Sequence, residues 1–193
     1  EFDTWPCFWG RGLPPNSWFS LPPPISALER WWARGPRASP FVGRLLNPTF
    51  CTDGAGGLEP HPRLRRCGWA VAQVYPPDGD DLVGSLGWAV FGQLPGEPQT
   101  VSRAEMAAVV VAITLGSGDA TIWTDHLNVV RGFEKGPSFL PAENQDLWEE
   151  LWQEVDRHPG RVIIRKVKAH LDRHPEQVLL FPPEVVVGNA VAD

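Results

Sequence analysis

Four carboxylates occupy positions where the sequence pattern predicts helices or strands to begin or end. Asp53 and Asp125 each close a short apolar run, Glu105 lies in the first turn of a predicted helix, and Asp193 lies on the last one. Each also has an ordinary structural explanation. Asp53 would open an Asx turn, and Asp125 would cap a helix. Glu105 would complete a capping box with Ser102, and Asp193 would be a surface acid.

Taken together, the four carboxylates predict a metal site. If the strands that end at Asp53 and Asp125 are neighbours, the two side chains emerge together at one end of a sheet. Clustered oxygen ligands suit Mg²⁺ or Mn²⁺ rather than zinc. Without cations the carboxylates would repel one another and some would protonate. Two divalent ions would remove that repulsion, activate water and stabilise the leaving oxygen of a phosphoryl displacement.

The elements that must position these residues follow a regular order, a strand meander and then helices alternating with two more strands. The expected strands are residues 49–53, 68–75, 83–93, 120–125 and 161–169. The expected helices are residues 101–115, 126–133, 144–157 and 186–193, with a proline-broken loop over 171–185. Hairpin-linked strands followed by crossover helices predict an α/β fold. Its mixed five-stranded sheet would combine a three-strand antiparallel meander with parallel strands, and helices would pack on it.

Residues 1–44 differ in composition from the rest of the chain. Nine of the 21 prolines fall within the first 50 residues, together with five of the ten tryptophans. Dense proline excludes regular helix and central strand, and only residues 25–33 are compatible with a helix. We therefore expect an arm or linker over 1–44, whose indoles dock onto another surface or cover the edge of an ordered domain over 45–193.

Composition narrows the class of protein further. A hydrophobic content of 42% over 193 residues excludes global disorder. Three cysteines without CxxC spacing favour a reducing compartment, so we expect an intracellular protein of the nucleus or cytoplasm. The longest uncharged apolar run, residues 106–118, is too short for a membrane span, so no membrane partner is expected. Without an initiator Met and with an end in mid-helix, the sequence reads as a piece of a longer protein.

Five segments over residues 45–193 resemble, in order, the motifs of type 1 ribonuclease H domains: FCTDGAGG, TVSRAEMAAV, TIWTDHLNVV, KVKAH and GNAVAD. The family's D-E-D-D carboxylates would be Asp53, Glu105, Asp125 and Asp193. The histidine of its V-K-G-H motif would be His170. The insertion after TDG and the phrase LPGEPQTVSRAE are most similar to the ribonuclease H domains of retroelement polyproteins, which contain reverse transcriptase. The last helix would then be truncated at Asp193.

The resemblance implies endonucleolytic cleavage of the RNA strand of an RNA–DNA hybrid with two Mg²⁺ ions, for which Mn²⁺ would substitute. By analogy, Asp53 would bridge both ions and Asp193 would hold the ion that activates water. Glu105 and Asp125 would hold the other ion, on the leaving-group side, and Glu105 would also sense a 2′-hydroxyl. His170 would assist proton transfer or product release.

Basic residues supply candidate nucleic-acid contacts despite the net charge of −6, of which the four carboxylates provide a large part. They are Arg63, Arg65, Arg66, Arg165, Lys166, Lys168 and Arg173. Ser102 stands beside the R-A-E motif, where family members touch the minor groove. A solvated basic face is the alternative interpretation.

Departures from the family leave other functions open. Family members often carry Asn or Gln where this chain has Val101 and Ser102, and Ser where it has His126. The basic protrusion of some members is absent, so hybrid positioning would fall to other polyprotein domains. A connection domain that binds nucleic acid or a neighbouring domain without cutting is therefore one alternative. A transposase-, resolvase- or exonuclease-like enzyme is another, and the groups His170/His174 and Cys51/His61/Cys67 lack the paired spacing of a zinc module.

Overall fold

The computed structural model describes residues 24–41, 43–56, 65–79 and 82–193. Arg63 and His61 lie outside these residues, as do most of the predicted arm and three of its tryptophans. Within the described ranges, no helix has the length and apolar character needed to cross a membrane.

A six-stranded mixed sheet runs through the molecule in the order β1-β5-β4-β3-β7-β8. Its strands are β1 (Trp31–Arg34), β3 (Thr49–Ala55), β4 (Gly68–Tyr75), β5 (Ser85–Gln93), β7 (Ala120–Thr124) and β8 (Val162–Lys166). β1, β5, β4 and β3 pair antiparallel, whereas β3, β7 and β8 pair parallel. Two short strands, β2 (Leu45–Leu46) and β6 (Gly116–Ser117), pair separately. The predicted fold class is confirmed.

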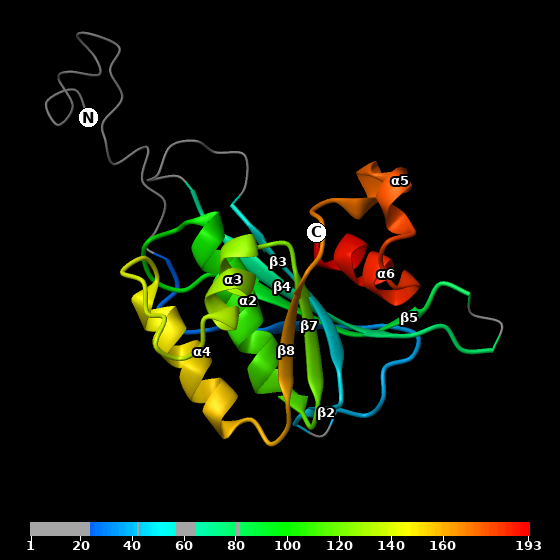
Figure 1. The fold of residues 1–193 in the computed structure, drawn as a ribbon, viewed down its shortest axis with the longest axis horizontal. Coiled ribbons are helices and arrows are strands. Elements are labelled where there is room, and N and C mark those ends of the chain that lie inside the picture. Colours follow the sequence, from blue (N-terminus) through cyan, green and yellow to red (C-terminus); the bar gives the residue numbers. More distant parts are fainter. Residues whose placement is uncertain (1–23, 42, 57–64, 80–81) are drawn as a thin grey trace, which may run out of the picture.

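Helices cover both faces of the sheet (Figure 1). One face carries α2 (Val101–Leu115), α3 (Leu127–Glu134) and α4 (Gln145–Arg157). The other is covered by α6 (Pro183–Ala192), which follows the 3₁₀ turn η2 (Leu171–Arg173) and α5 (Pro175–Val178) in the chain. Each face has its own apolar core, the larger around α2 and the smaller where α6 covers β3 and β4. The central strands β3 and β4 are therefore covered on both faces, whereas the edge strand β1 is exposed.

The strand count is the main correction to the sequence-based expectation. Residues 25–33 are not helical; Trp31–Arg34 instead pair with β5 and add an edge strand. Proline flanks these four residues without interrupting them, and an edge strand uses only one side of its backbone, so a proline-rich segment can still supply it. The indoles of Trp31 and Trp32 thus belong to the sheet edge, the second of the two expected roles.

The residue that caps α2 is a second correction, although α2 begins at Val101 as predicted. The N-cap is Thr100, whose side chain accepts a hydrogen bond from the Arg103 amide at 3.2 Å, and Ser102 lies inside the first turn. The expected capping box between Ser102 and Glu105 is therefore wrong. The predicted loop over 171–185 also contains η2 and α5, and α6 begins at Pro183, because proline suits the first turn of a helix.

Candidate metal centre

Parallel pairing of β3 with β7 brings two of the carboxylates together. Thr52 and Thr124 are register partners, and Asp53 and Asp125 follow them at the same end of the sheet. Neighbouring strands lie about 4.8 Å apart, so side chains leaving them at one level are within reach of a shared ligand. The strands that end at Asp53 and Asp125 are therefore neighbours, as the predicted metal site requires.

Glu105 reaches the same place from the first turns of α2. A Cβ built on Gly54 would lie 2.3 Å from the Glu105 amide nitrogen, so only glycine lets β3 and α2 approach this closely. The loop before α2 is held by Gln99, whose side chain accepts from the Cys67 amide at 2.8 Å and donates to the Leu94 carbonyl at 2.9 Å. Together these contacts fix where α2 begins relative to the strands.

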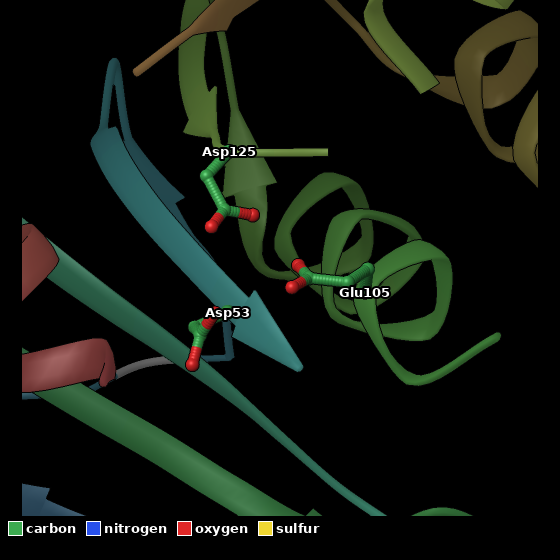
Figure 2. A group of neighbouring side chains, drawn as sticks. All are labelled: Asp53, Glu105 and Asp125. Carbon is green, nitrogen blue, oxygen red and sulfur yellow. The ribbon is translucent and has the colours of Figure 1, made fainter. Parts of the chain in front are cut away.

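The three carboxylates form a compact acidic cluster, defined here as Asp53, Glu105 and Asp125 (Figure 2). One oxygen from each lies within 4.8 Å of the others. Burial, reinforced by the charges of Asp125 and Asp53, raises the pKa of Glu105 to about 10. Burial also raises the pKa of Asp53, with the charges of Asp125 and Asp193 adding to it. Without a cation, the acidic cluster therefore favours bound protons over full negative charge.

The acidic cluster fits a hard divalent cation. Glu105 is 5% exposed, and its Oε2 atom is buried without a hydrogen-bond partner among the described residues. A buried acceptor left unpaired is costly in free energy, and so is a set of adjacent carboxylates. A bound cation would relieve both costs, and an all-oxygen donor set suits Mg²⁺ or Mn²⁺.

Asp193 lies beside the acidic cluster rather than within it. Its charge acts on Asp53, but it does not belong to the group of three whose oxygens lie within 4.8 Å. Its Oδ2 lies 3.1 Å from Nδ1 of His170, so the two residues expected from the last motifs are paired. Asn189 of α6 accepts from the Leu171 amide at 3.2 Å, which ties the His170 loop to this helix.

The basic candidates lie at different places in the fold. Lys166 lies at the end of β8, and desolvation lowers its pKa. The negative charges of Asp125 and Glu105 act in the opposite direction, which places Lys166 near the acidic cluster. Arg165 lies over the ring of Trp123, with its guanidinium carbon 5.5 Å from the centroid, and so it packs on the face that α6 covers. Lys168 is half-buried just beyond β8, whereas Arg173 is exposed in η2. Arg65 and Arg66, both half-buried, directly precede β4.

Ser102 lies near the acidic cluster in an unexpected pairing. Its Oγ lies 3.2 Å from Nε2 of His126, the residue that follows Asp125. Both line a cavity of about 290 Å³ between α2, α3 and α4. The sequence patterns did not predict the structural roles of Gly54, Gln99 and Thr100. Thr100 carried a usable signal, since threonine is a good N-cap and stands just before the helical pattern begins.

The two alternative zinc groups find no support among the described residues. Cys51 and Cys67 lie in different apolar cores, on opposite faces of the sheet. His174 pairs with Glu176, with 3.4 Å between the two side chains, whereas His170 pairs with Asp193.

Comparisons with known proteins give one curated relative and one similar solved structure. No model of a protein family matches the sequence. The chain is 30% identical over 143 residues to a ribonuclease H of Moorella thermoacetica, an alignment that covers 66% of this chain and 82% of the relative. It also resembles the crystal structure of LC9-RNase H1, a type 1 RNase H with the type 2 active-site motif. That match has a TM-score of 0.50 and 21% identity, and it covers 67% of this chain and 66% of the other, just under two thirds. The structural likeness supports the fold.

Proposed function

The chain belongs to the ribonuclease H family, and from this premise we propose that it is a metal-dependent endonuclease that hydrolyses the RNA strand of RNA–DNA hybrids. The observation that carries the proposal is the acidic cluster. Three carboxylates from β3, α2 and the end of β7 meet there, and one of their oxygens is buried with no hydrogen-bond partner in the described part of the chain. Such a site needs a cation, and cation-assisted hydrolysis is the chemistry that the family membership brings.

Asp53, Glu105 and Asp125 would hold the metal, with Asp53 central because it feels the charges of both Asp125 and Asp193. Two Mg²⁺ ions, when bound, would supply a water nucleophile and neutralise charge on the leaving oxygen. Asp193 would complete the ligand set from the end of α6. His170, hydrogen-bonded to Asp193, would hold or transfer a proton beside the scissile phosphate.

The substrate would be held by charge around the acidic cluster. We assign phosphate contacts to Arg65, Arg66, Lys166 and Lys168, with Arg63 as a further candidate outside the described residues. Ser102 would face a groove of the hybrid beside His126. A retroelement polyprotein as the parent protein, with the proline-rich arm contacting its other domains, remains part of the proposal and rests on the sequence motifs.

The decisive experiment uses an RNA–DNA hybrid labelled on the RNA strand, incubated with Mg²⁺, Mn²⁺ or EDTA. Single-stranded RNA, duplex RNA and duplex DNA serve as matched substrates. We expect metal-dependent cutting of the RNA in the hybrid alone, and its loss in Asp53→Asn and Asp125→Asn with the fold intact. Activity retained in both variants would overturn the proposal. Preferential cutting of duplex DNA would favour a transposase- or exonuclease-like enzyme.

The second candidate function is a connection domain that does not cut nucleic acid. The observation that favours it is the position of Asp193, which lies beside the acidic cluster rather than within it. Calorimetric titration with Mg²⁺ separates the two. Binding in the millimolar range or tighter supports the enzyme. No binding, also in a chain extended beyond Asp193, would favour the connection domain.

A further inference from the structure

A row of residues leads from the acidic cluster across the sheet to an exposed aromatic pair. Asp53 of β3 lies opposite Ala70 of β4, and Ala70 lies opposite Phe91 of β5. Phe91 in turn lies opposite Trp31 of β1. Directly opposed residues in a sheet project from the same face. The four positions therefore form one line over β3, β4, β5 and β1, on the face that α6 covers.

The far end of this line is exposed among the described residues. Phe91 is 46% exposed and Trp31 is 42% exposed, so the two rings present a large apolar surface. Their planes are inclined by 27° with centroids 6.3 Å apart, so the two rings stack on each other as one exposed aromatic pair. α6 packs over β3, β4 and β5 but stops at Ala192, beside the acidic cluster.

A cavity covers the first three positions of the line, from Asp53 to Phe91. It measures about 190 Å³ and is lined by Asp53, Ala70, Phe91 and Ala192, among others. Strands are spaced about 4.8 Å apart, so Phe91 and Trp31 lie about 10 and 15 Å from Asp53. Three or four stacked nucleotides span about that distance at 3.4 Å per nucleotide.

We propose that Trp31 and Phe91 form a stacking site for an unpaired nucleotide of the strand that occupies the acidic cluster. The site deepens the proposed function and rests on it. Unpaired bases expose their faces and stack on aromatic side chains irrespective of sequence, whereas paired bases are already stacked. Gly68, which lines the cavity, follows closely on Arg65 and Arg66, so positive charge for phosphates lies at the same end of β4. The occupant is therefore a single-stranded extension of the hybrid rather than an apolar protein surface.

The test measures binding without cleavage. Fluorescence anisotropy of a labelled oligothymidylate in EDTA and low salt is compared with that of an abasic strand carrying the same phosphates. We expect Trp31→Ala and Phe91→Leu to weaken oligothymidylate binding by about five-fold or more, the effect of losing one base–aromatic stack. Binding of the abasic strand should be weak and unchanged. Trp31→Phe, which keeps a ring, should restore most of the affinity.

Trp32→Ala is the matched control, because this neighbouring tryptophan is 38% exposed on the opposite face. It packs against Phe41 and Trp88 and should leave binding unchanged. Thermal unfolding of every variant separates lost stacking from lost stability, since Phe91→Leu preserves apolar volume. Equal binding of the abasic strand, undiminished binding by Trp31→Ala, or no binding by the wild type would overturn the stacking site. A change of oligomeric state in Trp31→Ala would also overturn it, because the pair would then be a protein interface.

The stacking site and the proposed function fail separately. Oligothymidylate binding needs neither metal nor cleavage, so a chain that binds but does not cut hybrids retains the stacking site and loses the nuclease assignment. If the nuclease is active, a single-stranded RNA tail on the hybrid should lower KM in the wild type, leave kcat unchanged, and have no effect in Trp31→Ala.

Discussion

Glu105 is the most deeply buried carboxylate of the acidic cluster, and its proton balance gives the first prediction. Its pKa of about 10 without metal means that it holds a proton at neutral pH. A cation needs the carboxylate, so Mg²⁺ binding should release a proton, and Mg²⁺ affinity should rise with pH. Calorimetry at pH 7 in buffers of different ionisation enthalpy counts the protons released. Glu105→Gln should abolish the release, and zero release by the wild type would contradict the prediction.

The same carboxyl group predicts how the stability of the metal-free protein depends on pH. The unfolded chain loses this proton above about pH 4.5, whereas the folded chain keeps it to about pH 10. The folded state therefore binds more protons in that window, and its free energy of unfolding should fall as pH rises. Glu105→Gln should remove part of this slope in urea unfolding at pH 5 and pH 8 with EDTA. An unchanged slope would argue against a buried, protonated Glu105.

Gly54 gives a prediction about geometry at a single position. A Cβ there would lie 2.3 Å from the Glu105 amide nitrogen, so Gly54→Ala must push α2 away from β3. We expect a loss of about 1–3 kcal/mol in unfolding free energy, together with weaker Mg²⁺ binding. Ala55→Ser, at the exposed neighbouring residue, is the control and should do neither. Normal Mg²⁺ affinity in Gly54→Ala would show that the close approach is dispensable.

At the scale of elements, α6 and the His170 loop act as one unit held by Asn189. This side chain is 2% exposed and accepts from the Leu171 amide. Asn189→Ala would leave that amide unpaired and should cost about 1–3 kcal/mol, lowering nuclease activity through displacement of His170. Asn189→Asp keeps an acceptor oxygen and should retain more activity, and Ala190→Ser, at an exposed position, should be neutral. Thermal unfolding and hybrid cleavage measure both effects.

Elements with a strong local pattern were predicted closely from the sequence. The bounds of α2 and β4 are those expected, because apolar periodicity and clear turn signals define both. β1 was not predicted, because pairing with β5 depends on a partner distant in sequence that composition cannot reveal. The acidic cluster followed from the order of elements and the family motifs. The separation of Asp193 from it depends on how α6 packs, which no sequence spacing encodes.

At the scale of the whole molecule, charge predicts a salt-dependent enzyme. A chain with net charge −6 would hold a hybrid through a few local cations, so binding should weaken with salt, with a slope set by that small number of phosphate contacts. Lys168→Ala should weaken hybrid binding at every sequence and reduce the slope of log affinity against log salt by about one. Arg157→Ala is the control, since Arg157 is paired with Glu154 at the end of α4. Equal slopes for wild type and Lys168→Ala would remove Lys168 from the interface.

The acidic cluster draws its ligands from three elements that are far apart in the chain, and this has a consequence for folding. No short fragment contains the site, so an ion bound there would bind the native state and not the unfolded ensemble. Mg²⁺ would then act as a folding ligand, and the melting temperature would keep rising with the logarithm of the Mg²⁺ concentration above the dissociation constant. Because the long-range β3–β7 contact must form first, the ion should slow unfolding more than it accelerates folding.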